Sequence, residues 1–180
     1  MIGVFVRRLS GAAMLDPATY EEIEADRGAT IQALAVVVLA SLAAGVGARG
    51  AAGTRPVLAF FALGAFVSLT LWAAFAALTY QIGSRLLPVL ETRVDGGQLL
   101  RTLGFAAAPG LLQIFAVFSG WTIPIFTLAI AWTLVASVVA VRQALDYAST
   151  RRAVAVCGLA WLLALLIGAM FTAVVAFAAE

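Results

Sequence analysis

Long apolar stretches alternate with short clusters of charged residues along the whole chain. A helix needs about 20 apolar residues to cross roughly 30 Å of hydrocarbon. Uncharged stretches of at least about this length predict five membrane spans, at residues 30–48, 57–83, 102–119, 122–141 and 153–179. The pattern therefore predicts an all-α polytopic membrane protein, a five-transmembrane-helix bundle that forms one domain over residues 1–180.

The third and fourth spans come from one stretch, residues 102–141, that is nearly free of charge. This stretch is too long for one crossing and suits two crossings joined by a tight turn. Ser119, Gly120 and Pro124 are the residues expected to form the turn. One long broken helix is the alternative to this hairpin.

Residues 1–29 precede the first span and predict one or two short helices at the membrane interface. Between Ile2 and Leu9 the apolar residues recur at helical spacing, while Arg7 and Arg8 fall on another face. The segment is therefore expected to form a short helix that lies in the membrane interface.

A second short helix is predicted over residues 17–27. Asp16 is a suitable N-cap and Pro17 is favoured at the first helical position. Gly28 is expected to stop the helix. Two apolar side chains of this helix are expected to face the membrane, those of Tyr20 and Ile23.

The distribution of arginine predicts the orientation of the bundle. With five spans, nine of the eleven arginines fall on the N-terminal side, at positions 7, 8, 27, 85, 93, 101, 142, 151 and 152, and two on the other, at 49 and 55. Short arginine-rich loops stay in the cytoplasm. We expect a cytoplasmic N-terminus, an outside C-terminus and a location in the inner (cytoplasmic) membrane of a cell. The use of arginine without lysine points to a prokaryote.

Composition excludes several classes of protein. The chain is 64% hydrophobic and 11% charged, which is too little polar material to cover a soluble domain. It has no histidine and a single cysteine, Cys157, so neither a metal set nor a histidine-activated serine can form. The predicted spans contain no charged residue of the kind that ion-coupled transporters need at depth. We expect no enzymatic activity, no metal, no cofactor and no nucleic-acid partner.

Charged residues gather at the span ends on the predicted cytoplasmic side. They are candidates for contact with a protein partner or with anionic lipid headgroups: Asp26, Arg27, Arg101, Arg142, Arg151 and Arg152. The alternative is a solvated rim whose charges only set the orientation.

The third span contains a candidate hinge at Pro109 and Gly110. A proline inside a helix removes a backbone donor and frees a carbonyl one turn earlier. A kinked helix that packs closely through small residues is the structural alternative. Pairs of small residues four apart, such as Gly64 with Ser68 and Gly104 with Ala108, permit such packing.

Several segments together resemble a known family. The order is MLDPATYEEIEAD at 14–26, TIQALAVVVLASLAAG at 30–45, YQIG at 80–83, LLRTLGFAAAPGLL at 99–112 and AVRQAL at 140–145. This order is similar to bacterial members of the Yip family, the Ypt/Rab-GTPase-interacting membrane proteins. The resemblance covers most of the chain and implies a cytoplasmic N-terminus, five spans and no enzymatic activity.

The resemblance says less about function than about fold. Eukaryotic Yip proteins bind prenylated small GTPases in vesicle traffic, but this chain lacks their long cytoplasmic N-terminal region, so we do not transfer that activity. Our leading hypothesis is a scaffold or adaptor that organises a partner at the cytoplasmic face, or that self-associates, among membrane lipids. The alternative is passive transport or lipid handling, through a pathway lined by residues such as Gln113, Thr127, Thr133 or Ser137.

Overall fold

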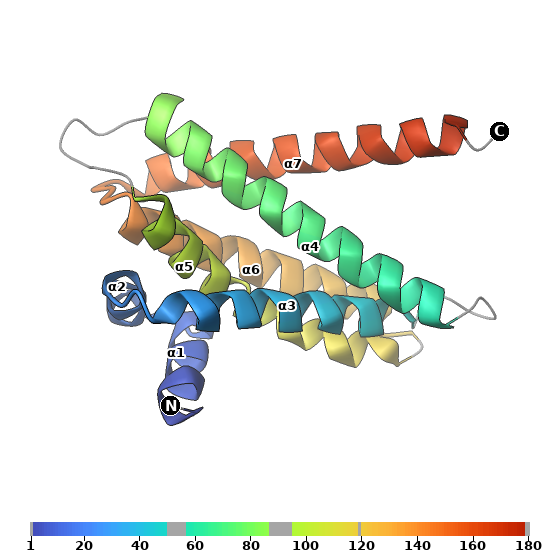
Figure 1. Ribbon diagram of the computed structural model, residues 1–180, viewed down its shortest axis with the longest axis horizontal. Coiled ribbons are helices and arrows are strands. Elements are labelled where there is room, and N and C mark those ends of the chain that lie inside the picture. Colours follow the sequence, from blue (N-terminus) through green and yellow to red (C-terminus); the bar gives the residue numbers. More distant parts are fainter. Residues whose placement is uncertain (1, 50–56, 87–94, 119, 179–180) are drawn as a thin grey trace.

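The computed structural model describes residues 2–49, 57–86, 95–118 and 120–178, and its regular elements over these residues are all helices (Figure 1). In chain order they are α1 (Ile2–Ala13), α2 (Pro17–Ala25), α3 (Ala29–Ala48), α4 (Val57–Gln81), the π-helical turn η2 (Ile82–Leu86), α5 (Gly96–Ala106), the 3-10 helix η3 (Ala108–Val117), α6 (Thr122–Ala144) and α7 (Thr150–Ala178).

Five segments of the described chain are long and apolar enough to cross a membrane, which confirms the predicted five-span helical bundle. They are Ala29–Ala48, Phe61–Arg85, Gly96–Val117, Thr122–Ala144 and Thr150–Met170. The α2 helix, the starts of α3, α5 and α7, and the ends of α4 and α6 lie together at one end of the bundle, at the left of Figure 1. We call this the charged end, and the opposite end the bare end.

The third span lies at the centre of the bundle. In its most apolar window 61% of the residues are buried, against 11% for the second span. It consists of α5 and η3, and it packs against α3 on one side and α6 on another. Its helix begins at Gly96 rather than at the predicted residue 102, because the Asp95 carboxylate accepts a hydrogen bond from the Gly97 N–H (2.9 Å) and caps the helix.

The third span changes from α-helix to 3-10 helix at Ala107. The Ala107 N–H bonds to the Gly104 carbonyl (3.3 Å), and the Gly110 N–H bonds to that of Ala107 (2.9 Å). Pro109 therefore lies in the first turn of η3, where an absent N–H costs least.

A tight turn joins η3 to α6, so the predicted hairpin is confirmed and one long broken helix is excluded. Gly120 in this turn has φ of +87°, a conformation that glycine adopts without strain. Pro124, a predicted turn residue, lies instead in the first turn of α6. Ser119 and the end of the predicted fifth span lie outside the described residues.

The predictions for the second short helix were partly wrong. Asp16 caps α2 and Pro17 begins it, as expected. However, Tyr20 and Ile23 are fully buried and do not face lipid, because α2 packs against α5 and α6. Helix α2 ends at Ala25, and Gly28 comes directly before α3.

Small residues let the helices of the bundle approach closely. A Cβ added at Gly64 of α4 would lie 3.0 Å from the Cα of Gly45 in α3. A Cβ added at Gly104 of α5 would lie 2.7 Å from that of Ala33 and 3.0 Å from its carbonyl oxygen. The predicted small-residue positions Gly64 and Gly104 thus lie at helix contacts.

We predict that Gly104→Ala lowers the free energy of unfolding by about 1–3 kcal/mol, because the added methyl forces α5 away from α3. The matched control is Gly158→Ala in α7, where an added Cβ meets nothing within 4 Å. That change should be neutral or stabilising, by up to about 1 kcal/mol, because alanine favours the helix. Denaturant unfolding in detergent micelles measures both. Equal stability of the two variants would contradict the close approach.

Candidate functional site

The α1–α2 hairpin covers the charged end of the bundle. Its turn passes through Leu15 with φ of 64°, followed by the Asp16 cap. The Tyr20 hydroxyl donates to the Ala12 carbonyl (3.1 Å), which joins the two helices. The indole Nε1 of Trp132 in α6 donates to the Ala13 carbonyl (2.8 Å), which joins the hairpin to the bundle.

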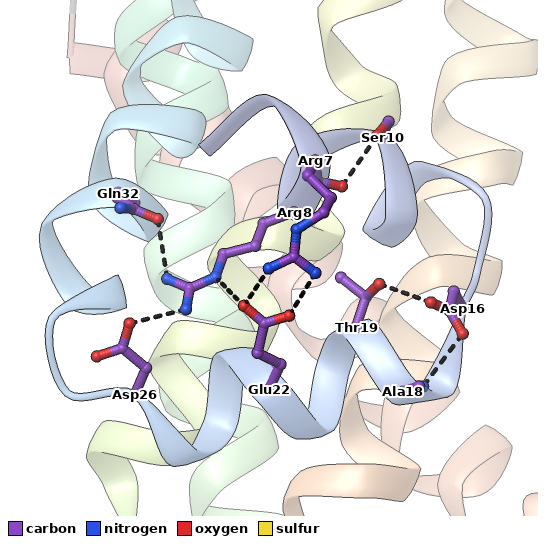
Figure 2. A network of polar contacts seen from close by, with 9 residues as sticks. All are labelled: Arg7, Arg8, Ser10, Asp16, Ala18, Thr19, Glu22, Asp26 and Gln32. Atoms are coloured by element: carbon purple, nitrogen blue, oxygen red, sulfur yellow. Dashed lines mark hydrogen bonds and ion pairs between the residues drawn. The ribbon is translucent and has the colours of Figure 1, made fainter. Parts of the chain in front are cut away.

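The centre of this end is Arg8, whose side chain is only 6% exposed. Figure 2 shows its guanidinium enclosed by α2 and the start of α3. Its Nε donates to Glu22 (2.9 Å), its Nη2 lies 2.8 Å from an Asp26 carboxylate oxygen, and its Nη1 donates to Gln32 (3.2 Å). The neighbouring Arg7, which is exposed, binds both oxygens of Glu22 at 2.7 Å. The network holds α1 against α2 and α3.

The ion pairs shift the pKa values of the groups involved. Hydrogen bonds from Arg7 and then Arg8 lower the pKa of Glu22. Arg8, followed by the Gly28 N–H, lowers the pKa of Asp26. Burial opposes the charge on Arg8, but Asp26 and Glu22 outweigh it, so the pKa of Arg8 is raised. All three shifts favour the charged forms, so the network is intact at neutral pH.

A second buried arginine, Arg101 of α5, lies beneath α2 and is 6% exposed. Its Nη2 donates to the Glu24 carbonyl (2.6 Å), while its Nε is buried without a hydrogen-bond partner among the described residues. Burial raises the pKa of the Glu24 carboxyl, Asp146 and Glu21 add to the rise, and Arg101 opposes it. The positive charge of Arg101 therefore offsets part of the effect of Asp146 and Glu21 on the Glu24 carboxyl.

Of the six predicted partner-contact residues, two are engaged inside the protein and four are exposed. Asp26, at the end of α2, forms an ion pair with Arg8, and Arg101 donates to the Glu24 carbonyl, so each is engaged by the protein itself. Arg142 and Arg152 are exposed and flank Tyr147: the Arg142 Nε donates to its carbonyl (3.4 Å), and the Arg152 guanidinium lies 5.7 Å from its ring centroid. The remaining two, Arg27 and Arg151, are exposed.

Sequence reasoning placed Arg8 on a separate face from the apolar residues of α1 but missed its ion pairs. A signal was available. Glu22 and Asp26 are four residues apart, so they share one face of the helix predicted over residues 17–27. A pair of arginines on a preceding amphipathic helix is the natural partner of such a face.

An apolar groove of about 610 Å³ lies beside Pro109, between α1 and the side of the bundle formed by α3 and η3. Its wall is formed by parts of four elements: Val6, Leu9, Ser10 and Ala13 of α1; Leu39, Leu42, Ala43 and Val46 of α3; residues 108, 109, 111, 112, 114 and 115 of η3; and Trp132 of α6. The candidate hinge residues Pro109 and Gly110 are buried, and only Pro109 reaches the wall. The polar residues predicted to line a pathway do not contribute to it.

These features define a multi-span membrane protein whose charged end is covered by a docked helical hairpin. The sequence model of the Yip1 domain matches residues 12–172, and the chain belongs to the Yip1 domain family. This is a family of non-enzymatic membrane proteins. Searches of curated proteins and of solved structures each returned no match.

We predict that Glu22→Gln lowers the free energy of unfolding by about 1.5–3 kcal/mol, because it leaves the buried Arg8 with half of its charge compensation. Glu21→Gln is the matched control. Glu21 is exposed, and its oxygen accepts from Gln143 (2.9 Å), which an amide oxygen can still do. That change should cost less than about 0.5 kcal/mol. Denaturant unfolding in micelles compares them, and indistinguishable variants would refute a central role for Arg8.

The Glu24 carboxyl gives a prediction with a definite pH dependence. Its pKa is raised in the folded state, so its charged form destabilises the fold at high pH, and this cost vanishes below the ordinary glutamate value of about 4.3. Glu24→Gln should therefore raise stability at neutral pH and leave it unchanged near pH 4. Thermal unfolding of both proteins at the two pH values tests this. A gain of equal size at both would rule out the electrostatic cause.

Proposed function

We propose that the protein is a non-enzymatic membrane scaffold or adaptor that holds a partner at its charged end. The observation that supports this most is the α1–α2 hairpin, which buried Arg8 and its two carboxylates fix in place. A fixed surface binds a partner without a large ordering cost. Charge at the bare end is sparse, so recognition of charged partners belongs to the charged end.

The exposed charges at this end favour a protein partner over a lipid surface. They carry both signs: Arg27, Arg142, Arg151 and Arg152 are exposed, and so are Glu21 and Asp146. Anionic membranes attract clusters of one sign, whereas protein interfaces match mixed charges. The partner is therefore a cytoplasmic or membrane protein, or a second copy of the chain, with membrane lipids around the spans.

Orientation and location are part of the same proposal. The excess of arginine at the charged end supports a cytoplasmic N-terminus and an outside C-terminus. We place the protein in the inner membrane of a prokaryotic cell, acting as one domain without enzymatic activity. Under this arrangement the α1–α2 hairpin faces the cytoplasm, where a soluble partner can reach it.

Lipid handling is the second candidate, and the apolar groove beside Pro109 favours it. The same groove argues against a pathway for ions or water, because its wall is almost entirely hydrocarbon. Pro109 and Gly110 would act as a hinge at the α5–η3 break. A lipid-scrambling assay in liposomes separates this role from that of a scaffold.

We predict that photoreactive residues placed at Arg27, Arg142 or Arg151 capture a protein partner in intact cells. These positions are exposed, whereas Glu22 and Arg101 are engaged inside the protein. The control is the same residue at Trp121, which is 63% exposed and precedes α6 at the bare end. Capture should weaken when Glu22→Gln loosens the hairpin. Lipid adducts alone, or equal capture at Trp121, would overturn the scaffold proposal.

A further inference from the structure

Helix α1 separates two very different environments. Arg8 points to α2 and the start of α3, as Figure 2 shows, while Val6, Leu9 and Ala13 line the groove. Helical periodicity places these three residues on one stripe, away from Arg8. In Figure 1 α1 runs away from the bundle at a steep angle to α3. Its apolar stripe therefore forms one wall of the groove, and the polar network lies on the opposite face of α1.

The groove offers hydrocarbon and almost no free polar group. Its two polar side chains are already engaged: the Ser10 hydroxyl donates to the Arg7 carbonyl (2.9 Å), and the Trp132 indole donates to that of Ala13 (2.8 Å). Water is a poor occupant, because a buried water needs two to four polar partners. An empty groove would forfeit dispersion contacts along its whole wall.

The groove is continuous with the lipid-facing surface of the spans. Leu39 and Leu42 of α3 are 45% and 39% exposed, and Ile114 and Phe115 of η3 are 45% and 54% exposed. These side chains belong to membrane spans, so in a bilayer their exposed parts contact acyl chains. The same side chains form the groove wall, so an acyl chain can enter from the membrane without crossing a polar barrier.

We propose that this groove is a binding site for one acyl chain of a membrane lipid. Its volume of about 610 Å³ is that of a ligand site, and α1, α3 and η3 supply walls for the chain while the groove stays open to the membrane. Because the wall carries no free polar side chain, the site recognises the chain and does not discriminate between headgroups. The inference requires neither the scaffold role nor lipid transport.

The test uses the full-length protein in nanodiscs that contain a phosphatidylcholine with a photoreactive group midway along one acyl chain. Labelled peptides are identified by mass spectrometry. We expect labelling concentrated at residues 39–46 and 111–115, reduced by unlabelled long-chain lipids irrespective of headgroup, and unaffected by short-chain ones. Uniform labelling of all spans, or competition that depends on the headgroup, would overturn the proposal.

Leu42→Trp fills the groove from the α3 wall, and Leu162→Trp on α7, where Leu162 is 56% exposed, is the matched control outside it. Groove labelling should fall about tenfold in the first and stay unchanged in the second, since the filled volume removes roughly one side chain of apolar contact. If Leu42→Trp does not elute as a folded protein, Ile114→Trp on the opposite wall replaces it. Undiminished labelling in a folded groove variant would refute the acyl-chain site.

Discussion

The burial of one positive charge, that of Arg8, determines how the N-terminal part of the molecule is built. A buried guanidinium is costly unless charged and polar acceptors surround it. Glu22, Asp26 and Gln32 supply these acceptors from α2 and from the start of α3. The charge can therefore be accommodated only when α1, α2 and the first span are assembled together. The ion pairs select this arrangement because any other leaves Arg8 uncompensated.

The rest of the bundle depends on close backbone contact instead of charge. Lipid is as apolar as the side chains, so helices in a membrane gain little from hydrophobic burial and must pack closely. Glycines at the α3–α4 and α3–α5 contacts make this possible. The third span is consequently the central element, and both the charged hairpin and the apolar groove are built around it.

The sequence predicted the spans well because hydropathy and length are strong, local signals. Five helices, the hairpin turn at Gly120 and the Asp16 cap all depend on residues close together in the chain. Tertiary contacts were harder to predict. Tyr20 and Ile23 are apolar, and the sequence cannot distinguish a side chain that faces lipid from one that faces another helix. The partners of Arg8 were missed because they lie 14, 18 and 24 residues away along the chain.

The polar network and the apolar groove are two consequences of where α1 lies. Its charged face needs acceptors, which Glu22, Asp26 and Gln32 provide, and its apolar face then lines the groove beside α3 and η3. The ion pairs that hold α1 therefore also set the position of the groove wall that α1 contributes. A partner that competed with Arg8 for Glu22 or Asp26 would release this wall. Conversely, an acyl chain beneath α1 would stabilise the docked hairpin that presents the charged surface, because linked binding equilibria act in both directions.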